Sequence, residues 1–487
     1  MVFSSIIFIH LFLPLLLFSY FLLPNLRTKN LWLLIASLIF YAWGERAYAL
    51  LMLISISMNY YFAIGIERFR DSRYEKIILI LAIVINLGLL GIFKYTSFAI
   101  DTVNGLLSYF NWQTISNPKI HLPAGISFYT FQALSYVIDI YRRTSLAQKS
   151  FSKVALFIAF FPQLIAGPII TYHDVSSQFD QRKVTSEDLI IGIQRFILGL
   201  AKKVLIANTL AAPVDEIFKI PGEQLTLGIA WLGIIGYTLQ IYFDFSGYSD
   251  MAIGLARMFG FHFIENFNYP YISKSIREFW RRWHISLSNW LRDYLYIPLG
   301  GSRCSPIRNY FNLMIVFTLC GLWHGASWNF VIWGLFHGFF LVVERLSFMQ
   351  WLNRVWFPIR HLYTISVVML GWVFFRSTNY TEAITFIGAL FGQGKGDGIS
   401  YNSATYFNLE VGLVIGIGII ASTPIFPYIA KIQSYFNLRH LKQNMFKVAF
   451  SSVGFALLNG SYFSFLFIAA IARLASGTYN PFIYFRF

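Results

Sequence analysis

His324 is the residue of this chain whose type and surroundings point most directly to chemistry. It lies in the sequence Gly321-Leu-Trp-His-Gly-Ala-Ser-Trp328, inside one of the most apolar stretches of the protein. An ionisable side chain in such a stretch is costly unless it is paired or functional. Histidine is the natural general base at neutral pH, and the small residues beside it leave room for a substrate. Two interpretations are open: a catalytic base, or a structural imidazole hydrogen-bonded to a backbone carbonyl.

Cys320 precedes His324 by four residues, so the two side chains would share one face of a helix. This spacing is compatible with a thiolate–imidazole dyad. The alternative is an inert cysteine that fills space in an apolar helix. His337 lies on the next apolar segment, and we expect it to make structural hydrogen bonds.

A second histidine, His284, lies in the basic, tryptophan-rich sequence Phe279-Trp-Arg-Arg-Trp-His-Ile-Ser-Leu-Ser288. The wider stretch Ile272–Arg308 has a large excess of basic over acidic residues. It is either a cytoplasmic loop with interfacial tryptophans or a site for an anionic donor, because arginine forks bind phosphate well. The residues that we expect to contact such a donor are Arg281, Arg282, Trp283, Ser288 and Trp323.

Carboxylates also occur in apolar surroundings. The sequence Gln240-Ile-Tyr-Phe-Asp-Phe-Ser-Gly-Tyr-Ser-Asp250 places Asp244 and Asp250 among hydroxyl groups. They are candidates for lining a polar tunnel, for orienting a histidine, for pairing with Arg257, or for a structural polar network. Asp139 precedes Arg142 by three residues, and this spacing favours an ion pair at the membrane interface.

The composition indicates that these polar residues belong to a membrane protein. Hydrophobic residues make up 57% of the 487 residues and charged residues only 12%, against about 25% charged in soluble domains. Apolar runs of about 20 residues recur along the chain, and roughly 11 to 13 of them are candidate membrane helices. We therefore predict an all-α, polytopic membrane protein. The net charge of +16 fits basic cytoplasmic loops and anionic lipid headgroups; no basic soluble domain exists to carry nucleic acid.

The order of the apolar runs predicts one transmembrane domain over residues 1–487, with an aromatic tail over residues 479–487. The run Val2–Leu23 is expected to remain as the first membrane helix. Basic residues after alternate spans orient the first five, the last of them about Leu122–Ile140. The segments Ala155–Ile170 and Leu189–Ile206 contain prolines, glycines or lysines and predict broken or re-entrant helices. The two cysteines predict neither a disulfide framework nor a metal site.

Seven stretches of the chain, three of them quoted above, form a pattern that is specific because they occur together and in this order. They are Leu122-Pro-Ala-Gly-Ile-Ser-Phe-Tyr-Thr-Phe-Gln132, Phe161-Pro-Gln-Leu-Ile-Ala-Gly-Pro168, Tyr242-Phe-Asp-Phe-Ser-Gly-Tyr-Ser-Asp250, Phe279–Ser288, Leu291-Arg-Asp-Tyr-Leu-Tyr-Ile-Pro-Leu-Gly-Gly301, Gly321–Trp328 and Trp372-Val-Phe-Phe-Arg376. Together they resemble the membrane-bound O-acyltransferases, in the bacterial branch of alginate and peptidoglycan O-acetyltransferases. The teichoic acid D-alanyl transferases are related to this branch.

This resemblance implies that His324 is the catalytic histidine and that His284 is its supporting partner. It implies acetyl transfer from acetyl-CoA, a substrate and not a tightly bound cofactor, across the inner membrane. A separate extracytoplasmic protein would complete transfer to a polysaccharide. The terminal sequence Pro481-Phe-Ile-Tyr-Phe-Arg-Phe487 resembles an aromatic motif in which a tyrosine is proposed as an acyl relay; here that residue is Tyr484. The alternative for the tail is an interfacial anchor.

Two other functions remain open at this level. A transporter or flippase of an envelope precursor would also place polar groups in the membrane, without making a bond. A D-alanyl transferase would use the same scaffold with another acyl group. Backbone amides near Gly321 or Gly325 are candidates for stabilising the oxyanion.

Overall fold

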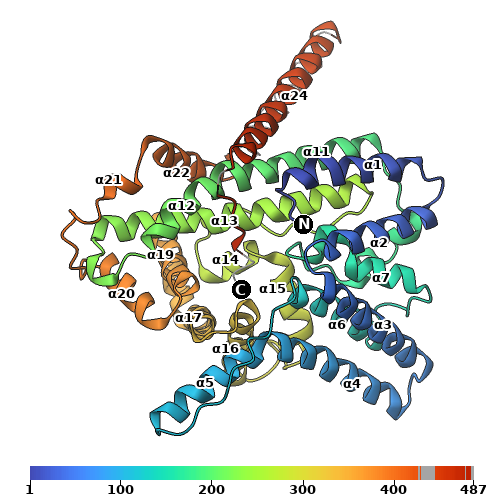
Figure 1. Ribbon diagram of the computed structural model, residues 1–487, viewed down its shortest axis with the longest axis horizontal. Coiled ribbons are helices and arrows are strands. Elements are labelled where there is room, and N and C mark those ends of the chain that lie inside the picture. The colour runs from blue at the N-terminus through green and yellow to red at the C-terminus, as the bar shows by residue number, and fades with distance from the viewer. Residues whose placement is uncertain (426–427, 429–444, 478, 484–487) are drawn as a thin grey trace.

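The computed structural model describes the chain except for residues 426–427, 429–444, 478 and 484–487 (Figure 1). The described residues form helices and contain no strand, which confirms the predicted all-α class. The helices of the first half are α1 (Leu13–Leu22), α2 (Leu26–Ala42), α3 (Arg46–Arg68), α4 (Arg73–Leu90), α5 (Thr96–Tyr109), α6 (Ile126–Tyr141), α7 (Phe151–Ala159), α8 (Phe161–Leu164), α9 (Tyr172–Val175), α10 (Gln178–Gln181), α11 (Ser186–Ala201), α12 (Asn208–Ile217) and α13 (Leu227–Met258).

The second half contains shorter helices around the candidate residues and then longer ones. They are α14 (Ile276–Arg282), α15 (Ile285–Leu291), α16 (Pro306–His324), α17 (Trp328–Val343), α18 (Met349–Arg354), α19 (Phe357–Arg376), α20 (Tyr380–Leu390), α21 (Ser403–Tyr406), α22 (Leu409–Ala421) and α24 (Met445–Ala475). Short π-helices interrupt or extend several elements: η1 (Phe8–Phe12), η2 (Gly91–Tyr95), η3 (Lys202–Ala207), η6 (Arg292–Tyr296) and η7 (Glu344–Phe348).

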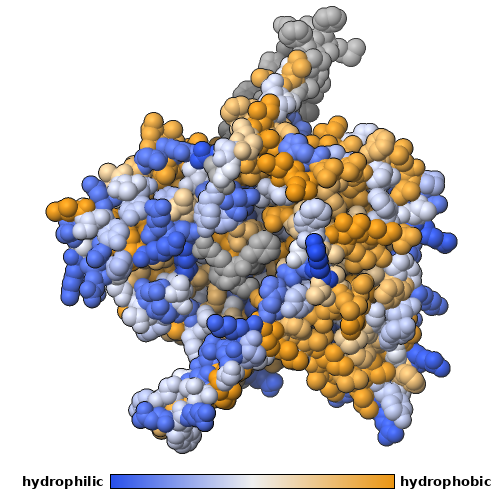
Figure 2. All heavy atoms as spheres, in the orientation of Figure 1, coloured by the Kyte–Doolittle hydropathy of each residue, from blue (hydrophilic) through white to orange (hydrophobic). Residues whose placement is uncertain are grey.

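Six of the described helices are long and apolar enough to cross a bilayer, and two shorter ones are also apolar. The six lie at Arg46–Arg68, Arg73–Tyr109, Leu227–Met258, Trp328–Leu346, Phe357–Arg376 and Leu457–Ala475. Large apolar side chains are exposed on the outside of the bundle, and Figure 2 shows them as a broad surface over α2, α3 and α4. Such a surface is unfavourable in water. The chain is therefore a multi-pass integral membrane protein.

α13 is the central helix of the molecule, and most of its residues are buried. α11 and α12 pack along it (Figure 1). A Cβ atom added at Gly199 would lie 2.5 Å from the carbonyl oxygen of Gly247, and one at Gly254 would lie 2.6 Å from that of Gly192. Glycine is required at this crossing because the two backbones touch, as is common between membrane helices.

The predicted broken segments have different outcomes. Ala155–Ile170 is interrupted between α7 and α8 and is buried throughout, as expected for a segment shielded by protein. Leu189–Ile206 is not broken at its two lysines, because the π-helix η3 continues α11 directly into α12. The wider turns of η3 keep the backbone helical while Lys202 and Lys203 reach partners on α13 and on the C-terminal tail.

α16 and α17 form a close antiparallel pair that carries His324. A Cβ atom added at Gly321 would lie 2.1 Å from the carbonyl oxygen of Phe330, and one at Gly334 would lie 2.2 Å from that of Phe317. Gly321 and Gly334 are needed at this crossing because the two backbones touch there.

Candidate active site

His324 is the last residue of α16 and is 5% exposed. The chain turns to an extended conformation at Gly325, which ends the helix. Three aromatic rings surround the imidazole with centroid distances of 5.0 Å to Trp323, 5.1 Å to Trp333 and 5.3 Å to Phe375. The helix end therefore presents the imidazole in a closely packed, largely apolar environment.

His284 lies between α14 and α15 and is fully buried. Its backbone has a φ of +45°, a left-handed conformation that is strained for a residue with a side chain. Its ring centroid is 6.3 Å from that of His324. The fold thus brings together the two histidines that the sequence separates.

Asn266 determines the tautomer of His284. The amide oxygen of Asn266 accepts hydrogen bonds from the backbone N–H and the hydroxyl of Ser286, and it lies 3.3 Å from Nδ1 of His284. Because this oxygen can only accept, Nδ1 carries the proton. Nε2 is buried and has no hydrogen-bond partner among the described residues. Burial lowers the pKa of His284 to about 3, so the ring is neutral at physiological pH and offers a lone pair at Nε2.

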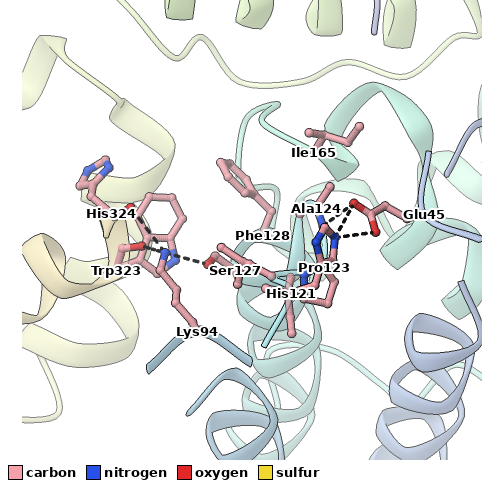
Figure 3. A pocket seen from close by; sticks show the side chains of 13 residues that line it. Glu45, Lys94, His121, Pro123, Ala124, Ser127, Phe128, Ile165, Trp323 and His324 are labelled. Atoms are coloured by element: carbon pink, nitrogen blue, oxygen red, sulfur yellow. Dashed lines mark hydrogen bonds and ion pairs between the residues drawn. The ribbon is translucent and has the colours of Figure 1, made fainter. Parts of the chain in front are cut away.

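A cavity of about 460 Å³, here called the lysine cavity, reaches His324 from one side. Its lining residues are Glu45, Lys94, His121, Leu122, Pro123, Ala124, Gly125, Ile126, Ser127, Phe128, Ile165, Trp323 and His324. Figure 3 shows His324 and Trp323 at one end, an interacting pair of Glu45 and His121 at the other, and Lys94 between them. The pair has a contact of 3.4 Å, and the His121 side chain is exposed.

A second cavity, here called the arginine cavity, has a volume of about 350 Å³ and reaches α16 from another side. Arg277, Arg281 and Arg292 line it, together with Ser288 and Cys320. A neighbouring cavity of about 330 Å³ shares the three arginines. These positive charges around a concave surface make a suitable site for a ligand with several phosphate groups.

The expected donor-binding residues separate into two groups. Arg281 and Ser288 line the arginine cavity, and Trp323 lines the lysine cavity. Arg282 instead forms an ion pair of 3.0 Å with Glu278. Trp283 is buried among aromatic rings, stacked on Phe279 and against Trp372. The geometry therefore favours Arg281, Ser288 and Trp323, which line cavities, for contact with a ligand.

Asp244 and Asp250 belong to ion pairs inside the bundle. Asp244 lies 2.5 Å from Lys203, and Asp250 accepts from Arg195 and Lys202 at 2.7 Å. Neither lines the lysine or the arginine cavity. Among the alternatives from the sequence, the structural polar network agrees with this geometry, and a role in a polar tunnel stays a prediction.

Two expected ion pairs are replaced by others. Arg257 contacts Asp188 at 3.2 Å and not Asp250. Asp139 accepts a hydrogen bond of 2.7 Å from the hydroxyl of Tyr294, and it does not form the expected pair with Arg142. Asp250 and Asp139 each contact residues that are distant in sequence, and local spacing does not reveal such partners.

The C-terminal tail enters the bundle beside α13. The backbone N–H of Ile483 donates to Asp244 at 2.8 Å, and Phe482 stacks on Tyr248 with a centroid distance of 4.7 Å. Phe482 and Ile483 are buried, so this part of the tail packs inside the protein. Tyr484 lies outside the described residues, and its role stays a prediction.

The structure bears on two expectations about hydrogen bonds. The N–H of Gly325 already donates to the carbonyl of Gly321 at 3.2 Å, and the other backbone amides near Gly321 and Gly325 stay a prediction for the oxyanion. The structural hydrogen bonds expected of His337 are not found among the described residues. His337 is fully buried against Trp280 and Trp333, and neither of its ring nitrogens has a hydrogen-bond partner in the described part of the chain. Its surroundings are aromatic faces, which offer no conventional acceptor.

Four residues at the site are not expected there from the sequence: Lys94, Glu45, His121 and Asn266. Lys94 had a detectable signal, since it is a lysine in the apolar run that begins near Ile77. The other three are polar residues in loops or at helix ends. Only their meeting in space distinguishes them from ordinary surface residues.

Comparison with known proteins shows the family of this chain. A model of the membrane-bound O-acyltransferase family (MBOAT) matches residues 142–381. Over its full length the chain is 41% identical to a probable alginate O-acetylase of Pseudomonas aeruginosa, which is covered completely. It is 37% identical to a peptidoglycan O-acetyltransferase of Helicobacter pylori over 80% of each chain. It is 30% identical to a teichoic acid D-alanyltransferase of Bacillus subtilis, over 54% of this chain and 71% of the relative.

Proposed function

Because this chain belongs to the membrane-bound O-acyltransferase family and is an O-acetyltransferase of the alginate and peptidoglycan branch, we propose that it transfers acetyl from acetyl-CoA towards an envelope or exported polysaccharide, with His324 as the general base. The relatives are named as transferases, so the transporter interpretation is set aside. The acetyltransferase relatives cover 80% or more of this chain and the D-alanyltransferase 54%, which favours acetyl as the acyl group.

The observation that supports this proposal best is the position of His324 at the end of α16, a helix that lines a cavity on each of two sides. His324 lines the lysine cavity, and Cys320, one helical turn earlier, lines the arginine cavity. Four residues along a helix correspond to about 6 Å. A donor in one cavity and an acceptor in the other would meet at the end of α16.

The donor fits the arginine cavity by charge. Acetyl-CoA carries several phosphates, and Arg277, Arg281 and Arg292 present guanidinium groups around the cavity. Arginine holds phosphate oxygens through paired hydrogen bonds. The thioester would then extend along α16 towards His324.

The reaction itself needs one proton transfer and one acyl transfer. The acceptor hydroxyl gives its proton to His324 while its oxygen bonds to the thioester carbon. The carbon–sulfur bond breaks, and the departing thiolate takes up the proton from His324. General base catalysis of this kind is worth about two to four orders of magnitude in rate. The closely packed aromatic surroundings of His324 would exclude water, which otherwise hydrolyses the thioester.

His284 supports His324 without being charged. The neutral ring, held by Asn266, presents the lone pair of Nε2 in the same buried region. A neutral ring at this place adds no positive charge beside His324, which would oppose the uptake of a proton by that histidine. The transfer would take place in the inner membrane. A partner protein on the extracytoplasmic side would then receive the acetyl group.

The test is a strain that lacks the gene and carries either the unchanged protein or a variant. We expect His324→Ala to lose acetyl esters from the polysaccharide while the protein remains in the membrane at an unchanged level. His10→Ala, an exposed histidine on η1, is the control and should restore acetylation. Mass analysis of each glycan identifies the acceptor. Normal ester content with His324→Ala would refute the role of this residue.

A further inference from the structure

The end of α16 poses a specific problem of hydrogen bonding. The last four carbonyl groups of an α-helix have no partner within the helix, and a buried carbonyl without a partner is costly. In α16 these groups belong to residues 321–324, and the last of them is the carbonyl of His324 itself. Their partners therefore help to determine where the imidazole lies.

All four carbonyls have partners, and two consecutive residues supply three of the bonds. The carbonyl of Gly321 accepts from the N–H of Gly325. The hydroxyl of Tyr95 donates to the carbonyl of Leu322 at 2.8 Å. The ammonium group of Lys94 donates to the carbonyl of Trp323 and lies 3.5 Å from that of His324 (Figure 3).

The element that carries these two residues is unusual. Lys94 and Tyr95 end the π-helix η2, in the middle of the long helix from Arg73 to Tyr109. π-helical turns inside α-helices occur frequently at functional sites, where they change the direction of side chains. The hydroxyl of Ser127 on α6 accepts a further contact from Lys94 at 3.3 Å. The ammonium group is thus held by groups from two different helices.

The charge of Lys94 has no carboxylate partner among the described residues. It is 8% exposed, and its contacts are carbonyl and hydroxyl oxygens. A positive charge at a helix C-terminus is favourable. A neutral hydrogen-bond donor would also satisfy these carbonyls, at a lower cost of desolvation. Lys94 lines the lysine cavity together with His324. Its amino group therefore lies beside the place where the reaction would occur.

We infer that Lys94 and Tyr95 are positioning residues for the transfer reaction: they cap the end of α16 and so hold the imidazole of His324 in its reactive place. This inference rests on the proposed role of His324. Displacement of a catalytic group by about 1 Å can reduce the rate by about a hundredfold. Binding of the donor in the arginine cavity, which Lys94 does not line, should not depend on the cap.

The kinetic test uses membrane vesicles that contain the full-length protein, supplied with labelled acetyl-CoA. Lys94→Met should lower kcat by about a hundredfold and leave KM for acetyl-CoA unchanged. Lys94→Arg keeps the charge and the donors and should recover at least a tenfold part of that loss. Tyr95→Phe removes one bond and should lower kcat by about tenfold. The matched control is Lys76→Met, an exposed lysine on the same long helix, which should not change either constant.

A second measurement does not depend on the donor. Hydrogen–deuterium exchange of the peptide over residues 316–327 should be faster in Lys94→Met and Tyr95→Phe than in the unchanged protein and in Lys76→Met. Faster exchange with a fall in kcat and an unchanged KM supports the inference. Unchanged kcat in Lys94→Met, or a fall in kcat with no change in exchange, overturns it. If the unchanged protein does not use acetyl-CoA, the proposed donor is wrong, and exchange alone decides whether Lys94 and Tyr95 cap α16.

Discussion

Cys320 and His324 lie one turn apart on α16 and line different cavities. The cysteine belongs to the cavity with three arginines, and the histidine belongs to the cavity with Lys94. One short piece of helix therefore connects a site suited to a phosphate-bearing donor with a site that opens towards Glu45 and His121. Because Cys320 lines the cavity suited to the donor, substitutions at this position test whether its thiol takes part in the transfer.

We predict that Cys320→Ala retains acetyl transfer. Cys320 is buried and makes no hydrogen bond among the described residues, so nothing indicates an activated thiolate. The ester content of the polysaccharide should remain within about twofold of normal, since only a small cavity is created. Cys320→Trp, which fills the end of the arginine cavity, should abolish activity. Loss of activity in Cys320→Ala at normal protein level would instead support a thiol intermediate.

Asn266 should be needed because it selects the tautomer of His284. In Asn266→Leu the proton on Nδ1 loses its acceptor, and we expect a fall in kcat of about 10- to 100-fold, corresponding to the loss of one or two buried hydrogen bonds. Asn266→Asp keeps an acceptor oxygen and should be much more active. Asn268→Ala, an exposed neighbour, serves as the control. Equal activity of the Leu and Asp variants would show that the tautomer does not matter.

The arginines can be tested through KM. Arg281→Gln should raise KM for acetyl-CoA about tenfold or more, because charged hydrogen bonds to phosphate are lost, while kcat changes little. The control is Arg354→Gln on α18, which lies outside the arginine cavity. The rise in KM should be smaller with a donor that lacks the phosphates. A normal KM in the Arg277→Gln and Arg281→Gln proteins would place the donor elsewhere.

The glycine contact between α16 and α17 should tolerate no side chain. Gly321→Ala and Gly334→Ala place a methyl group about where the opposite backbone lies, and overpacking of this kind costs about 1–3 kcal/mol or more. We expect a lower Tm in thermal unfolding and a loss of activity from displacement of His324. Gly88→Ala on α4, where nothing lies within 4 Å, should unfold at the normal temperature. A normal Tm for both variants of the pair would show that the helices can separate at no cost.

Much of the scaffold could be predicted because local hydrophobicity determines which segments become membrane helices. The predicted run Val2–Leu23 corresponds to η1 and α1, and the predicted span at about Leu122–Ile140 corresponds to α6. Local hydrophobicity does not predict that the helix around Lys94 continues to Tyr109. The helix can include this lysine because the amino group finds carbonyl partners inside the protein.

The sequence by itself determined the all-α membrane class and the excess of arginine near His284, and it singled out His324 and His284 as candidates. These properties depend on residue types and on short spacings. Only the tertiary structure decided which polar groups meet. Lys94 caps the helix of His324, Asn266 sets the tautomer of His284, and Asp139 pairs with Tyr294 rather than with its neighbour in sequence. The physical reason is that a buried polar group takes whichever partner the packing of distant helices brings within hydrogen-bond distance.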